Sequence, residues 1–282
     1  MSVHQPSRTV GPKALPAAAI LLAHLLPLTL PFTSVSGRDW LACGVTCVVI
    51  IFAVGGGLHR YFAHRAFKTS RAFQLFLGVL AACFFGDPVG FAGKHRLHHR
   101  HADTERDVHS PRQGLWYCWI GHLLEERCTE REVLAAAADL ARYPELMWLH
   151  RYYFVPGTLA AGCMFLAGGY SLLVAGYVLS WCLMAVHAPA LVNYVCHRAG
   201  NRRFETADGS TNNALVGFLL FGEGWHNNHH RYPGSARSGL EWYELDLLFG
   251  MLKALAWLGL VWDLREAPRT GALRFVKETR CA

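Results

Sequence analysis

The stretch HRLHHRHAD at residues 95–103 carries three histidines in the pattern His-x-x-His-His, and GEGWHNNHHRYP at residues 222–233 repeats that pattern. The chain has 16 histidines among 282 residues. At that frequency one such triple arises by chance in roughly one chain in twenty, and two arise in roughly one chain in a thousand. The repeated triple therefore indicates a functional site and not a chance pattern.

The spacing of the triples has a physical meaning. Residues three and four apart share one face of a helix, so each triple directs three imidazoles into one small volume, where neutral rings can bind a metal. A further pair, His59 and His64 in HRYFAHR, is five residues apart, which is about 140° around an ideal helix. These two histidines require a frayed helix end, or they serve different metals.

The number of histidines indicates more than one metal. A structural zinc site is closed by four ligands, so eight clustered histidines are too many for one such site, and two metals are implied. All-imidazole sites suit iron, zinc, copper or nickel. Asn193 and His197 lie four apart in VNYVCHRAG and share a helix face. An amide is a weak ligand, so we expect Asn193 to hold a metal-bound water.

The composition indicates a membrane protein with a large part outside the bilayer. The chain is 52% hydrophobic and 17% charged, with a mean hydropathy of +0.19. A bilayer core requires about 20 mostly apolar residues per helix. We predict a single, all-α domain over residues 1–282 with four transmembrane helices, at about residues 15–32, 40–57, 154–169 and 172–191.

The apolar segment 72–92 decides the topology. If it crossed the bilayer, His59 and His95 would lie on opposite sides, so we interpret it as re-entrant or interfacial. The four spans then form two hairpins, and the basic residues crowd the histidine side, which the positive-inside rule assigns to the cytoplasm. We expect a cytosolic helical cap of residues 58–151 and 192–282, with the active site and both termini cytoplasmic.

Other features complete the expected architecture. The sequence Thr129-Glu130-Arg131-Glu132 has the form of a capping box that opens a helix over residues 133–142. The apolar stretch 247–262 contains Lys253 and is short, which favours a helix at the membrane surface or under the cap. The net charge of +7 suits a surface facing anionic lipid headgroups. No basic motif with interleaved aromatic residues indicates binding to nucleic acid.

Four segments together carry a resemblance to a known family. HRYFAHR, HRLHHRHAD, VNYVCHRAG and GEGWHNNHHRYP resemble the three histidine boxes, and the additional Asn and His site, of the membrane fatty acyl desaturases of the delta-9 acyl-CoA and acyl-lipid type. The resemblance implies a cytosolic diiron site with nine histidine ligands and a water held by Asn193. Carried over by position, the ligands are His59, His64, His95, His98, His99, His197, His226, His229 and His230.

The resemblance also implies an activity. Breaking unactivated methylene C–H bonds is beyond side-chain acids and bases, and the family uses O2 and two electrons for it, with iron cycling between Fe2+ and Fe3+. The expected product carries a delta-9 cis double bond. We expect carboxylates to orient the ligand rings, with Glu223, Asp103 and Asp107 as the nearest candidates and Glu105 as a fourth.

The carrier of the acyl chain and the electron donor stay open. Gly93 and Lys94 stand where the acyl-CoA branch has an Arg-Asp pair, and Ala190 stands where it has a tryptophan, so CoA, lipid and carrier-protein substrates are all considered. Electrons are expected from a separate ferredoxin-like or cytochrome-type protein and its reductase. The alternative functions are a diiron membrane hydroxylase acting on an acyl or alkyl chain, which only product analysis separates, and a metal transporter, which would place histidines within the spans.

Overall fold

The computed structural model describes residues 14–125 and 127–268. Helices dominate the described chain. Its strands are β1 (Lys68–Thr69) and β2 (Val261–Trp262), which pair antiparallel as a ladder of two residues each. The predicted helical character is confirmed. The predicted cytoplasmic termini, residues 1–13 and 269–282, lie outside the described residues.

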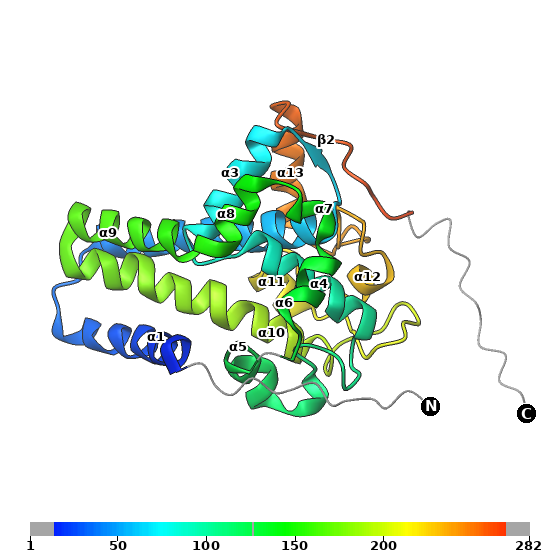
Figure 1. Cartoon of the computed structure of the whole chain (residues 1–282), viewed down its shortest axis with the longest axis horizontal. Coiled ribbons are helices and arrows are strands. Elements are labelled where there is room, and N and C mark those ends of the chain that lie inside the picture. The colour runs from blue at the N-terminus through cyan, green and yellow to red at the C-terminus, as the bar shows by residue number, and fades with distance from the viewer. Residues whose placement is uncertain (1–13, 126, 269–282) are drawn as a thin grey trace, which may run out of the picture.

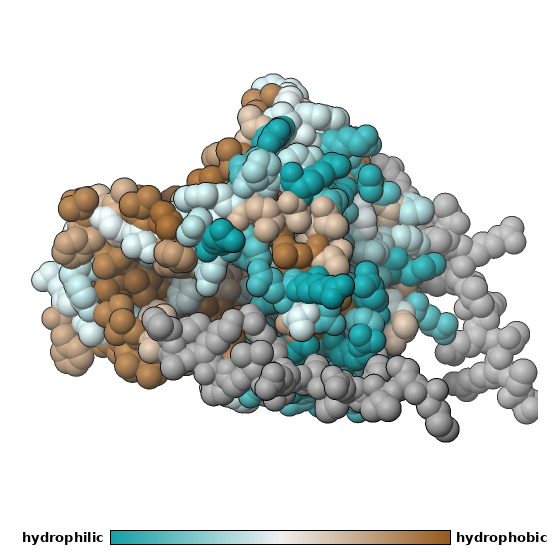
Figure 2. Space-filling model, viewed as in Figure 1, coloured by the Kyte–Doolittle hydropathy of each residue, from teal (hydrophilic) through white to brown (hydrophobic). Residues whose placement is uncertain are grey.

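An apolar group of helices forms one end of the molecule (Figures 1 and 2). Two helical segments, Gly37–Ala63 and Phe154–Val195, are long and apolar enough to cross a membrane by length and composition. Gly169, with φ 70° and ψ −158°, breaks the second segment into two arms that run side by side. Helices therefore occupy the predicted ranges 40–57, 154–169 and 172–191. The elements are α2 (Gly37–Ile51), η2 (Phe52–Ala63), α9 (Phe154–Ser171), η5 (Leu172–Leu179), η6 (Cys182–His187) and α10 (Ala188–Val195).

The first predicted span is a composite helix. It consists of α1 (Ala14–Leu25) and the 3₁₀ helix η1 (Leu26–Phe32). Pro27 and Pro31 lack the N–H group that an α-helix needs, which explains the change of helix type. The chain then turns, and Ser36 caps α2 in a capping box with Asp39. The box satisfies backbone donors at the start of the helix that the sequence predicted from residue 40.

The segment 72–92 forms two helices joined by a turn. It consists of α3 (Arg71–Ala82), too short to cross a bilayer, a turn, and α4 (Pro88–His101). The Tyr177 hydroxyl donates to the Cys83 carbonyl at 2.6 Å, and the Trp181 indole N–H donates to the Phe84 carbonyl at 2.9 Å. These bonds join the turn to the apolar helical segment Phe154–Val195.

Shorter elements build the other end of the molecule. The predicted capping box of Thr129 and Glu132 is confirmed, but the helix it opens breaks at Ala137. The predicted helix 247–262 is also too long, because Gly259 adopts φ 72° and the chain continues into β2. The remaining elements are η3 (Pro111–Gln113), η4 (Tyr117–Gly121), α5 (His122–Leu124), α6 (Glu130–Ala136), α7 (Ala138–Ala141), α8 (Pro144–Tyr152), α11 (Ala214–Leu219), α12 (His226–Arg231) and α13 (Leu247–Trp257).

The main hydrophobic core lies between these two ends. Phe62 of η2, Leu77 of α3, Leu146 and Leu149 of α8 and Leu252 of α13 are almost completely buried in it. Burial of such side chains stabilises a fold by about 1.5–3 kcal/mol each. The core therefore fixes η2 and α4, the two helices that carry the first two histidine motifs.

Candidate metal centre

All nine histidines of the predicted ligand set lie in two adjacent clusters. In each cluster the candidate ligand atoms lie within 4.8 Å of one another. We call them the five-histidine cluster and the four-histidine cluster. The first contains His59, His64, His95, His99 and His229, and the second contains His98, His197, His226 and His230.

A π-helix explains how His59 and His64 reach the same cluster. Residues 52–63 form the π-helical segment η2, and the His64 N–H donates to the His59 carbonyl at 3.1 Å, an i to i+5 bond. In this wider turn, residues five apart share a face, and the two ring centroids are 5.0 Å apart. The expectation that these histidines need a frayed helix end or separate metals is therefore wrong. It assumed an ideal α-helix, whereas this segment is a π-helix.

Helices α4 and α12 each supply both clusters. On α4, His95 and His99 are four apart and belong to the five-histidine cluster, whereas His98 belongs to the other. On α12, His226 and His230 are four apart and join the four-histidine cluster. The two clusters are therefore held as one rigid pair. Across them, the rings of His99 and His230 stack with centroids 4.4 Å apart.

The Nε2 atoms of the rings converge. In the five-histidine cluster, Nε2 of His229 lies 3.0 Å from that of His59 and 2.9 Å from that of His99. In the four-histidine cluster, Nε2 of His226 lies 3.1 Å from that of His197 and 3.0 Å from that of His230. Neutral imidazole binds a metal through such a nitrogen lone pair.

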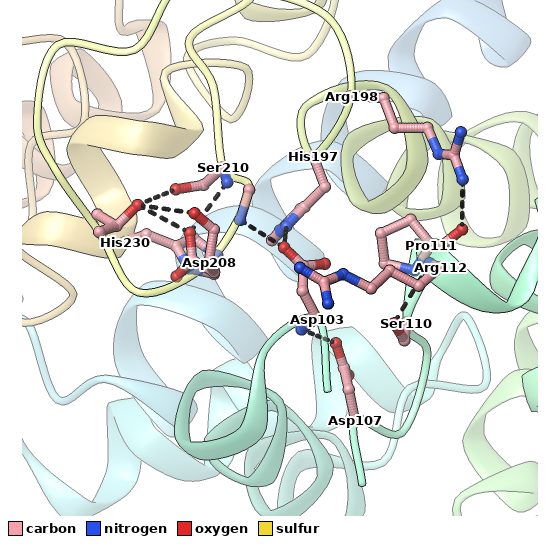
Figure 3. Close-up of polar contacts among 12 residues, drawn as sticks. Asp103, Asp107, Ser110, Pro111, Arg112, His197, Arg198, Asp208, Ser210 and His230 are labelled. Carbon is pink, nitrogen blue, oxygen red and sulfur yellow. Dashed lines mark hydrogen bonds and ion pairs between the residues drawn. The ribbon is translucent and has the colours of Figure 1, made fainter. Parts of the chain in front are cut away.

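Carboxylates hold the opposite ring nitrogens. The Nδ1–H of His98 donates to Asp107 at 2.9 Å. The Nδ1–H of His197 donates to Asp103 at 3.1 Å, and that of His230 donates to Asp208 at 2.8 Å; Figure 3 shows these residues. A hydrogen bond at Nδ1 fixes the tautomer that leaves Nε2 free to bind a metal. Each ring therefore presents its lone pair to the cluster.

Three of the four proposed orienting carboxylates are confirmed as ring partners. Glu223 accepts a bond from Nδ1 of His59, and Asp103 and Asp107 act as described above. Glu105 is exposed and has no such role. The sequence interpretation missed Asp208, which lies 22 residues before His230 in a loop whose only local signal is the turn-forming Asp-Gly pair.

The electrostatics suit neutral rings beside charged carboxylates. Burial, followed by the charges of neighbouring groups, lowers the pKa values of six cluster histidines well below the ordinary value; these are His64, His95, His99, His226, His229 and His230. Burial raises the pKa of Glu223, but the charges of His59 and Arg60 outweigh it and lower that pKa to about 2. At neutral pH these six rings are uncharged and the carboxylate of Glu223 is ionised.

The donor set fits a pair of transition metals. Nε2 of His98 is buried without a hydrogen-bond partner, although a buried polar atom normally has one. A metal in the four-histidine cluster would satisfy this atom. The described residues offer no thiolate to either cluster, and imidazole nitrogens are ligands that iron, zinc and copper accept.

Asn193 and the remaining histidines are not members of either cluster. Asn193 lies on α10, one turn before His197, and no hydrogen bond among the described residues joins it to either cluster. His109 is buried and stacks on His98, with centroids 4.2 Å apart. His150 pairs with Asp87, and His187 accepts a bond from the Trp119 indole. His101 is partly buried near the end of α4.

The fold and the site define a helical metalloprotein with apolar helices and a histidine-rich centre, and sequence comparison identifies its family. The family model described as fatty acid desaturase matches residues 38–263. The chain belongs to the fatty acid desaturase family. It is therefore an oxidoreductase, a fatty acyl desaturase, and its apolar helices agree with the membrane association of such enzymes.

Several relatives cover most of the chain. It is 36% identical to an acyl-CoA C20 Delta5-desaturase of Anemone leveillei over 248 residues, which is 86% of this chain and 78% of that protein. It is 37% identical to the sn-1 stearoyl-lipid 9-desaturase of Anabaena variabilis over 243 residues, 83% and 88% of the two chains. It is 34% identical to delta-9 acyl-lipid desaturase 1 of Arabidopsis thaliana over 263 residues, 88% and 82%.

Proposed function

We propose that the chain introduces a delta-9 cis double bond into a saturated fatty acyl chain in an O2-dependent reaction, using two irons held by the nine histidines. The observation that carries the proposal is the pair of buried clusters in which Nε2 atoms converge and carboxylates hold Nδ1. Membership of the desaturase family supports the choice of iron and of an acyl substrate. The delta-9 position rests on the relatives that are named lipid 9-desaturases.

The chemistry divides between the metals and the protein. Two bound irons, with O2 and two electrons, supply an oxidant able to break unactivated C–H bonds. Over the whole reaction, O2 takes two hydrogens from the acyl chain, with two electrons and two protons from outside, and leaves as two waters. The protein holds the rings in one tautomer through Asp103, Asp107, Asp208 and Glu223. We assign Asn193 to hold a water on one iron.

The membrane arrangement belongs to the same proposal. All four apolar ranges cross the bilayer as two hairpins, and residues 58–151 and 192–282 form a cytosolic cap within a single domain. The support is the path of α3 and α4, two helices joined by a turn that Tyr177 and Trp181 hold. This path returns the chain to the side of His59 before His95, so that both histidines join one cluster.

The acyl carrier is proposed to be a lipid, with CoA and carrier protein as the alternatives. A side chain at Gly93 would place its Cβ 2.5 Å from the Val133 carbonyl oxygen, so an arginine like that of the acyl-CoA branch cannot occupy this position without moving α6. The electron donor is a separate ferredoxin-like or cytochrome-type protein with its reductase.

Product analysis tests the proposal. The chain is expressed in a host of known lipid composition that lacks the double bond, and mass spectrometry locates any new unsaturation and its lipid class. We expect a delta-9 monoene in membrane lipids, absent from cells that express His229→Ala. A hydroxylated chain in place of the alkene would favour the diiron hydroxylase, and a delta-5 product would correct the position.

A further inference from the structure

The two histidine clusters differ in the negative charge that surrounds them. In the four-histidine cluster, three of the four rings donate Nδ1–H to an aspartate, at 2.9, 3.1 and 2.8 Å. In the five-histidine cluster, among the described residues only the His59 ring has a carboxylate partner, Glu223. The cluster with fewer imidazoles therefore has more carboxylates.

A buried cation offsets part of the charge of Glu223. The guanidinium of Arg60, which is 1% exposed, donates to Glu223 Oε1 from Nε at 3.2 Å and from Nη2 at 3.0 Å. The same guanidinium holds Asp246 through Nη1 at 2.9 Å. The carboxylate that binds the His59 ring is therefore already paired with a buried cation, which reduces its electrostatic effect on the cluster.

The three aspartates of the other cluster have neutral partners instead. Beyond their histidines, they accept bonds from main-chain N–H groups, those of residues 209, 103, 109 and 210, and Asp208 also accepts from the Thr206 hydroxyl. No ion pair within residues 14–125 and 127–268 joins Asp103, Asp107 or Asp208 to an arginine or lysine. Their negative charge acts on the four-histidine cluster without compensation.

This difference favours different oxidation states at the two positions. A nearby negative charge stabilises the more highly charged ion, and the effect is strong in a buried site of low dielectric. A carboxylate at Nδ1 also makes the imidazole a better electron donor to its metal. The additional ring of the five-histidine cluster is neutral and supplies no such charge.

We propose that the two irons are electrostatically unequal, with Fe3+ held more strongly by the four-histidine cluster and the first electron accepted by the five-histidine cluster. The proposal rests on the diiron function proposed above. With both irons bound, one electron from the donor would convert Fe3+ to Fe2+ in the five-histidine cluster, and a second electron would then convert Fe3+ to Fe2+ in the four-histidine cluster. The carboxylates set this order, and Arg60 contributes to it by offsetting part of the charge of Glu223.

Stepwise reduction of the iron-loaded protein tests the order. Full-length protein in detergent is loaded with ⁵⁷Fe, and its Mössbauer spectrum is recorded oxidised, after one electron equivalent of dithionite, and after two. Asp208→Asn and Glu223→Gln keep the shape of each side chain and remove its charge, so each variant identifies the doublet of its own cluster. Either variant suffices for the assignment if the other does not fold.

After one electron equivalent, the wild-type spectrum should keep the ferric doublet of the four-histidine cluster, which is the doublet that Asp208→Asn perturbs. The doublet of the five-histidine cluster, which Glu223→Gln perturbs, should become ferrous. Asp208→Asn should bring the two reduction steps closer together. Asp87→Asn is the matched control, because Asp87 pairs with His150 at 2.7 Å outside both clusters and asparagine also caps a helix. It should leave both doublets and both steps unchanged.

Two results would overturn the proposal: the reverse order of reduction, or equal conversion of both doublets at one equivalent. Iron content separates this failure from failure of the proposed function. Wild-type protein that binds two irons and reduces them in the reverse order contradicts only the inequality. Wild-type protein that does not bind two irons contradicts the diiron function itself.

Discussion

The hydroxyl of Tyr177 donates to the main-chain carbonyl of Cys83 at 2.6 Å, across 94 residues of sequence. It also bonds to the Gly157 carbonyl at 3.0 Å. One side chain therefore ties the turn before α4 to two helices of the apolar bundle. Since α4 carries His95, His98 and His99, this contact links the bundle to the metal centre.

Tyr177→Phe should therefore destabilise the protein. The two carbonyls share the single hydroxyl proton of Tyr177, and loss of a buried hydrogen bond that leaves an acceptor unsatisfied costs about 1–3 kcal/mol. Thermal unfolding in detergent is the measurement, with Tyr170→Phe as the control, because the Tyr170 hydroxyl bonds to Thr29 at an exposed position. We expect a lower unfolding temperature for Tyr177→Phe only. Equal shifts in the two variants would show that the turn is not held in this way.

Removing one ring from each cluster should remove one iron at a time. His64→Ala opens the five-histidine cluster and His197→Ala opens the four-histidine cluster, so each should lower bound iron from near two per chain toward one and abolish desaturation. Metal analysis of purified protein measures this loss. His187→Ala should keep both irons, because His187 bonds to Trp119 and His24 instead. Loss of iron from this control would contradict the assignment.

Stability should depend on pH through His150. The hydrogen bond to Asp87, stronger in its effect than burial, raises the pKa of His150 above its ordinary value. The folded state therefore binds this proton more tightly than the unfolded state, so the pair stabilises the protein fully below the unfolded pKa and loses this effect as pH rises through the folded pKa.

His150→Gln removes the titrating group, so it should cost more stability at pH 6 than at pH 8. Unfolding temperatures of the variant and the wild type at the two pH values measure this difference. The side chain of His150 is only 15% exposed. Arg71→Gln, which breaks a surface pair with Glu145, is the comparison, because neither member of that pair titrates between pH 6 and pH 8. Its cost in stability should be similar at both pH values. A loss of stability in His150→Gln that was larger at pH 8 than at pH 6 would contradict stabilisation by the protonated form of His150.

Topology can be tested with reporter fusions. If α3 and α4 are re-entrant, fusions after Arg71 and after Arg142 report the same compartment, the cytoplasm, and a reporter inserted in the loop around Arg38 reports the opposite side. Opposite results after Arg71 and Arg142 would mean that residues 72–92 cross the bilayer.

The sequence predicted most of the site because its information is local. His95, His98 and His99 share a helix, as do His226, His229 and His230, and periodicity reveals both sets. Asp208 was missed because only a long-range loop contact brings it to His230. The apolar pattern at residues 247–262 continues through Gly259, so pattern alone could not locate the end of α13; the positive φ of that glycine ends it.

The geometry of His59 and His64 was beyond such reasoning for a different reason. The ideal angle of 100° per residue separates them, and the change to a π-helix is favoured by tertiary contacts that the local sequence does not describe. Arg60 is bonded to Glu223, Asp246 and the Ala236 carbonyl, all far away in the chain. These distant partners help to hold η2 in its unusual winding.

The continuity of α2 and η2 has a mechanical consequence. The apolar residues near Asp39 and the cluster histidine His59 belong to one unbroken helix, Gly37–Ala63. In the proposed arrangement this helix would connect the lipid layer to the histidine clusters. In that arrangement, the number of residues between Asp39 and His59 in this helix determines how far the metals lie from the bilayer. Small movements of the surrounding loops leave that depth unchanged, and an acyl chain entering from the lipid would meet the metals at a constant level.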